Sequence, residues 1–114
     1  NATMVYITWI LQRKKELKII MPRKTNINYM MRLVKKFIDD PEASRYVFED
    51  MVYLELEKRY RLMASEDREY AEVFYDYIVE NGTDAGDSLS DSEYRDLIAE
   101  QYYEVKDIAA SGFY

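Results

Sequence analysis

Carboxylates and tyrosines are the side chains of this sequence that could do chemistry or bind a partner. From residue 63 onward the chain carries 14 acids and three cations, and tyrosines alternate with the acids. Tyrosine is enriched at protein interfaces, where it offers a large contact area. We therefore expect a partner-binding surface formed by Tyr70, Tyr75, Tyr77, Tyr102 and Tyr103. Rows of carboxylates on rigid helices also imitate the phosphates of a duplex, so an acidic inhibitor or antitoxin-like role is the first alternative.

Enzymatic chemistry finds little support, because the chain has no His and no Cys. This composition excludes a Ser-His-Asp triad, a thiolate nucleophile, a disulfide and a Cys-based zinc site. No pair of carboxylates stands out as an acid and a base, and there is no Gly-rich phosphate loop. The sequence therefore predicts a protein that is not an enzyme and needs no cofactor.

One acidic cluster, formed by Glu66, Glu69, Glu72 and Asp76, has the residue types of a carboxylate metal site. Di-metal sites in helix bundles normally add histidine through Glu-x-x-His pairs, and this chain has no histidine. The loop at 81–92 carries aspartates, but a serine stands at the twelfth position, where a calcium loop needs glutamate. An exposed acidic helix face explains the cluster more simply, so no metal site is predicted.

The charges are divided between the two ends of the chain. Residues 1–36 have a net charge of +8, and residues 37–114 have a net charge of −14. The core of the basic end is a patch that comprises Arg13, Lys14, Lys15, Lys18, Arg23 and Lys24. Such a patch could neutralise phosphates, so a nucleic-acid-associated regulator is the second alternative. A pI of about 4.7 and the absence of any nucleic-acid-binding signature disfavour it, and the two poles could instead attract each other within the fold.

The N-terminal segment is apolar at residues 4–11 and basic after them. Eight apolar residues are too few to span a bilayer, and a signal peptide would have its positive charges in front. We therefore expect a non-exported, cytoplasmic protein, and we interpret residues 1–3 as the remnant of a cleaved tag. Residues 4–21 favour a helix, with an extended strand as the rival because the first residues are β-branched and aromatic. Tyr6, Trp9 and Ile10 are the predicted self-association element, through which a homodimer could form.

The composition favours a few long helices, because the chain has only three Gly and two Pro. We predict an all-α fold: one domain at 4–114, built as a single small bundle of four to five helices, in which segment 4–21 is a helix or, alternatively, extended. Capping residues mark the helix boundaries. The predicted starts are Asn26, Asp40 with Pro41 at the first helical position, the group 65–67, and Ser90 in a capping box with Glu93. The predicted ends are Asp39–Asp40, about residue 63, Gly82 in a left-handed conformation, and about residue 109.

The helix at 41–63 is apolar on nearly every side, which predicts a central helix with several neighbours. Two stripes stand out at helical spacing. They are Val47, Met51, Leu54 and Leu62, and Tyr46, Tyr53 and Tyr60. Taken together, the sequence predicts a small, non-catalytic protein-interaction module that uses acidic, tyrosine-rich helices to bind a protein partner or a second copy of itself. No membrane and no small-molecule substrate is indicated.

Overall fold

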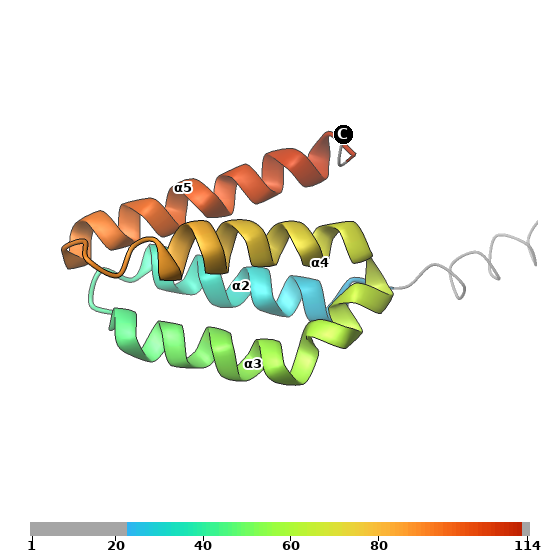
Figure 1. Ribbon diagram of the computed structural model, residues 1–114, viewed down its shortest axis with the longest axis horizontal. Helices are drawn as coiled ribbons and strands as arrows, with labels where there is room; N and C mark the ends of the chain where they lie inside the picture. The colour runs from blue at the N-terminus through green and yellow to red at the C-terminus, as the bar shows by residue number, and fades with distance from the viewer. Residues whose placement is uncertain (1–22, 113–114) are drawn as a thin grey trace, which may run out of the picture.

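Four helical rods make up the part of the chain that the structure, a computed structural model, describes, namely residues 23–112 (Figure 1). Helix α2 spans Thr25–Asp39, α3 spans Arg45–Glu66, α4 spans Arg68–Phe74 and continues directly into η1 at Tyr75–Asp84, and α5 spans Asp91–Ala110. Residues 23–112 contain no strand. The predicted all-α bundle is therefore confirmed.

Each rod contributes one apolar face to a shared core. Helix α2 packs against α3 and α5, and α5 also lies along η1. The core side chains that are fully buried include Ile27, Met30, Val34, Val52, Met63, Phe74, Ile78, Val79, Tyr94, Ile98 and Val105. At one end of the bundle the rings of Phe37 and Phe48 stack with centroids 4.2 Å apart, and Tyr94 meets Phe37 edge to face at 5.9 Å. Burying a large apolar side chain stabilises the fold by roughly 1.5–3 kcal/mol, so this core holds the four rods together.

The start of α2 differs from the prediction, because Asn26 does not cap it. The carboxylate of Glu66, at the end of α3, accepts hydrogen bonds from the backbone N–H groups of Asn26 and Ile27 at 2.8–3.0 Å. It also accepts one from the Asn26 side chain at 2.6 Å. A negative charge at a helix N-terminus meets the positive end of the dipole and its free N–H groups. Glu66, which the sequence suggested only as part of an acidic cluster, therefore joins α2 to the end of α3.

The start and the packing of α3 also correct the prediction. The helix begins at Arg45 and not at Pro41, because Ser44 is its N-cap and residues 41–42 form a turn. Its buried face consists of Phe48, Val52, Leu56 and Met63. The two predicted core stripes instead lie at the surface: Tyr46, Val47, Met51, Tyr53, Leu54 and Leu62 are exposed, and Tyr60 is half-buried. Helix α3 is therefore an outer helix of residues 23–112 and not the central one.

The chain turns sharply at Asp67, which is extended and caps α4 by accepting a hydrogen bond from Tyr70 N–H at 3.1 Å. The break expected at 65–67 is therefore confirmed. The next rod loosens into the π-helix η1, which buries both Ile78 and Val79. Gly82 does not end this helix in a left-handed conformation. It lies inside η1, where an added Cβ would stand 3.0 Å from Ile98 Cδ1, so the glycine allows α5 to approach closely.

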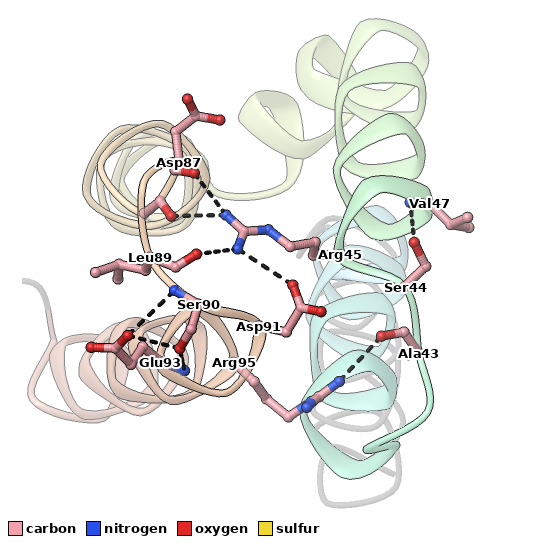
Figure 2. A network of polar contacts seen from close by, with 11 residues as sticks. Ala43, Ser44, Arg45, Val47, Asp87, Leu89, Ser90, Asp91, Glu93 and Arg95 are labelled. Carbon is pink, nitrogen blue, oxygen red and sulfur yellow. Dashed lines mark hydrogen bonds and ion pairs between the residues drawn. The ribbon is translucent and has the colours of Figure 1, made fainter.

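A buried arginine fastens the far end of η1 to α3 (Figure 2). Arg45 is 6% exposed, and its guanidinium donates hydrogen bonds to the backbone carbonyls of Gly86, Asp87 and Leu89, which belong to the loop between η1 and α5. It also lies 3.6 Å from Asp91 Oδ1 and covers the Tyr94 ring at 4.1 Å. A planar guanidinium with five donors suits such a set of acceptors. These contacts, which we call the Arg45 clamp, fix the loop that precedes α5.

The start of α5 confirms the predicted capping box. The Ser90 side chain accepts a hydrogen bond from Glu93 N–H, and the Glu93 carboxylate accepts one from Ser90 N–H, each at 3.3 Å (Figure 2). The Ser90 hydroxyl and N–H lower the pKa of the Glu93 carboxyl below its ordinary value. The helix then buries Tyr94, Ile98, Tyr102 and Val105 and ends at Ala110, with Gly112 in the left-handed region at φ 82°.

Candidate functional site

A groove between α3 and the rod formed by α4 and η1 is the candidate binding site. It has a volume of about 440 Å³ and is lined by Tyr53, Leu56, Glu57, Tyr60 and Tyr75. We call these five residues the tyrosine groove. The two rods meet at the turn around Asp67 and pack there, and contacts between α3 and η1 are sparse further along (Figure 1). The groove therefore lies where the two rods separate, with Leu56 as its buried floor.

Hydrogen bonds and ring contacts hold the walls of the tyrosine groove in place. The Tyr53 hydroxyl donates to Asp84 Oδ1 at 2.6 Å and lies 2.8 Å from Thr83 Oγ1, so it links α3 to the end of η1. Tyr60 and Tyr75 meet edge to face, with centroids 6.1 Å apart, so they link the same two rods near the turn. Fixed aromatic walls lose little conformational entropy when a partner binds.

The field around the tyrosine groove is negative. Burial raises the pKa of Tyr53, and the charges of Asp84 and Glu49 raise it further. Burial also raises the pKa of Tyr60, and Glu72 and Asp76 add to this effect while Arg68 opposes it. Together with Glu57, which lines the groove, these acids surround it with carboxylates from both rods. Arg68, the cation that opposes this shift at Tyr60, is paired with Glu72 at 3.3 Å. A concave, low-dielectric surface lined by one sign of charge attracts ligands of the opposite sign.

The five tyrosines proposed from the sequence do not form one surface. Tyr75 lies in the tyrosine groove and is exposed, whereas Tyr77 is half-buried. Tyr70 and Tyr102 belong to the hydrophobic core, so their rings are not offered to a partner. Tyr103 is half exposed on α5, where its ring contacts Tyr102 edge to face at 5.1 Å. Only Tyr75 of this set therefore contributes to the groove.

Sequence reasoning missed Tyr53 and Tyr60 as site residues. Both belong to the stripe Tyr46–Tyr53–Tyr60, whose spacing of seven predicts a shared helix face but does not indicate a binding groove. A second stripe on the same helix, Phe48–Val52–Leu56, has no hydroxyl group. When one helix carries both stripes, the less polar stripe is the one that is buried, so this comparison could have placed Tyr53 and Tyr60 at the surface.

Most of the predicted basic patch lies outside the described residues, namely Arg13, Lys14, Lys15 and Lys18. The self-association residues Tyr6, Trp9 and Ile10 also lie outside them. Of the remaining patch residues, Arg23 is exposed, and Lys24 lies 3.5 Å from Asp67 and 5.6 Å from the Tyr70 ring centroid. Lys24 is thus engaged at the start of α2.

The two charge poles scarcely pair with each other within residues 23–112. This part of the chain has 21 acids and 12 cations, a net charge of −9. Its ion pairs are mostly within one helix; between elements the structure shows Lys24–Asp67 and Arg45–Asp91. Most acids of α4, η1 and α5 are exposed. Ion pairs within residues 23–112 therefore neutralise few of these acids, and much of the acidic surface of this part of the chain is open to a partner.

Residues 23–112 contain neither a cluster of metal ligands nor a membrane-spanning helix. Between residues 23 and 112 no three carboxylates converge closely enough to hold a metal ion, and Glu66 of the predicted acidic cluster is occupied with capping α2. None of the helices in the same range combines the length and the apolar character that a bilayer crossing requires.

Comparison with known proteins adds no assignment to this geometry. No protein-family model, no curated protein and no solved structure matches the chain. The functional argument therefore rests on the site itself.

Proposed function

We propose that this protein is a non-catalytic interaction module whose tyrosine groove binds a basic, amphipathic segment of a protein partner. One observation carries the proposal: a preformed groove has an apolar floor, three tyrosine walls and carboxylates on both sides. An apolar side chain of the partner would enter over Leu56. Lysine or arginine side chains beside it would meet the carboxylates and the faces of the tyrosine rings.

The acidic inhibitor considered from the sequence is one form of this activity, because an inhibitor of a basic enzyme would present the same groove to its target. A cytoplasmic location remains part of the proposal, since a chain without cysteine gains nothing from an oxidising compartment.

The direct test is the binding of a defined probe, a synthetic amphipathic helix of leucine and lysine, measured by fluorescence anisotropy. We expect saturable binding that weakens as salt rises, and no binding of the matching leucine–glutamate helix. Tyr75→Ala should weaken binding by about tenfold or more, because truncating a central interface tyrosine costs at least about 1–2 kcal/mol.

Tyr103→Ala is the matched control, since it removes the same side chain from an exposed acidic position on α5. Its affinity for the probe should equal that of the wild type. Equal binding by wild type and Tyr75→Ala, or a loss of binding in Tyr103→Ala alone, would contradict the assignment of the groove.

A further inference from the structure

An uncovered apolar stripe runs along α3 on a different face from the tyrosine groove. It consists of Val47, Met51, Leu54 and Leu62, which are between 42% and 59% exposed. With about 100° per residue, Tyr53 and Tyr60 lie about 200° and 180° around the helix from Met51. No segment between residues 23 and 112 covers the stripe. Contiguous apolar surface of this kind marks a place where another segment packs.

Val47 and Met51 of this stripe form one wall of a second groove, between α2 and α3. Two adjoining hollows of about 530 and 400 Å³ share Leu33, Lys36 and Met51. Tyr29 lines the first hollow, and Val47 lines the second. We call this the α2–α3 groove.

The chain enters α2 at one end of this groove. The contacts of Lys24 with Asp67 and of Asn26 with Glu66 place residue 23 beside the C-terminal end of α3. Residues 4–21 precede this point and are separated from it only by Pro22. A helix that folds back at Pro22 would therefore run along the α2–α3 groove, antiparallel to α2, without crossing any other element.

The length of segment 4–21 matches the position of the α2–α3 groove if the segment is a helix, but not if it is a strand. As a helix, residues 4–21 would be about 27 Å long, and the apolar run 4–11 would lie about 15–26 Å from the turn. Along α2, Leu33 lies about 12 Å and Phe37 about 18 Å from Thr25. Phe37 stacks on Phe48, and Met51 and Val47 line the same hollows as Leu33, so these α3 residues lie at about the same distance from the turn. The apolar run therefore overlaps the α2–α3 groove. As a strand it would begin about 33 Å from the turn and pass beyond the end of the groove.

We propose that residues 4–21 form a helix that packs into the α2–α3 groove of the same chain and covers Leu33, Met51 and Val47. The charge of the segment alone would favour the acidic tyrosine groove, but that groove lies on the opposite side of α3 from Met51. The short connection through Pro22 therefore selects the α2–α3 groove. The inference is independent of the proposed function, because it concerns a different face and occupant.

Trp9 is a built-in reporter for this contact, since the chain has one Trp and it lies in the apolar run. We expect a blue-shifted Trp9 emission and weak quenching by acrylamide in the full chain. Met51→Asp should shift the emission to the red and increase quenching severalfold. Because Met51 is at the surface, this variant should keep its helical circular dichroism. Tyr103→Asp, a matched exposed position on α5, should leave Trp9 unchanged.

Disulfide trapping shows which groove the N-terminal segment occupies and whether the contact lies within one chain. The protein has no cysteine of its own, so only the two introduced cysteines can react. Ile10→Cys combined with Met51→Cys should form an intramolecular disulfide in dilute solution, whereas Ile10→Cys combined with Tyr75→Cys should not. A solvent-exposed Trp9 in the full chain, efficient trapping to position 75, or trapping found only in a covalent dimer would each overturn the proposal. The last result would assign the groove to the N-terminal segment of a second copy.

Discussion

Replacing Arg45 by methionine tests the structural account most severely. Methionine keeps much of the apolar stem but removes the guanidinium, so the carbonyls of Gly86, Asp87 and Leu89 lose their charged donor (Figure 2). Each carbonyl left without a partner costs about 1–3 kcal/mol where water cannot replace the donor. Asp91, the ion-pair partner of Arg45, is 83% exposed and stays solvated, so the loss comes from the carbonyls. Summed over three carbonyls, we expect Arg45→Met to lower the free energy of unfolding by about 3–5 kcal/mol and Tm by more than about 10 °C.

The assay is urea unfolding followed by far-UV circular dichroism, with Arg61→Met as the control. Arg61 is exposed on the same helix, so its replacement should change the unfolding free energy by less than about 0.5 kcal/mol. Arg45→Lys should fall between the two, because one ammonium cannot serve three carbonyls at once. A loss below about 1 kcal/mol for Arg45→Met, or an equal loss for Arg61→Met, would refute the clamp.

Three further predictions concern single contacts. Glu66→Ala should lower the unfolding free energy by about 1–2 kcal/mol in urea titrations because α2 loses its cap, whereas exposed Glu100→Ala should not. Gly82→Ala should destabilise the fold by about 1–3 kcal/mol in the same assay, and Ile98→Val, which removes the clashing Cδ1, should cost less in the Gly82→Ala background than alone. Burial and the charge of Glu49 raise the pKa of Tyr94, so the unfolded state loses this proton first as pH rises. Stability should therefore be intact below about pH 10 and fall above it, and Tyr94→Phe should reduce this slope in unfolding measured across alkaline pH.

Features set by neighbouring residues were predictable from the sequence. The capping box of Ser90 and Glu93 and the break near Asp67 depend on side chains that bond to backbone within the next three residues. The end of α5, predicted at about residue 109 and found at Ala110, is a feature of the same local kind. Such signals do not depend on how the rods pack.

Features set by distant residues were not predictable in the same way. The cap of α2 comes from Glu66, 40 residues away from Asn26. Helix α3 is apolar on nearly every side, so only the position of α2 decides that Phe48 and Val52 are buried while Val47 and Met51 are not. The π-helical stretch that lets Val79 join Ile78 in the core has no signature in a 3.6-residue periodicity. Because helix packing determines which side chains are buried, the candidate site is the tyrosine groove and not the five tyrosines predicted from the sequence.

The most direct test of the central claim is a map of where a basic helix binds. In amide NMR spectra of the full chain titrated with the leucine–lysine helix, we predict saturable shifts that concentrate at Tyr53, Glu57, Tyr60 and Tyr75 and weaken with salt. Shifts that concentrate on α2 or around Tyr103, or no saturable shift at low salt, would contradict the assignment of the tyrosine groove as the binding site of this protein.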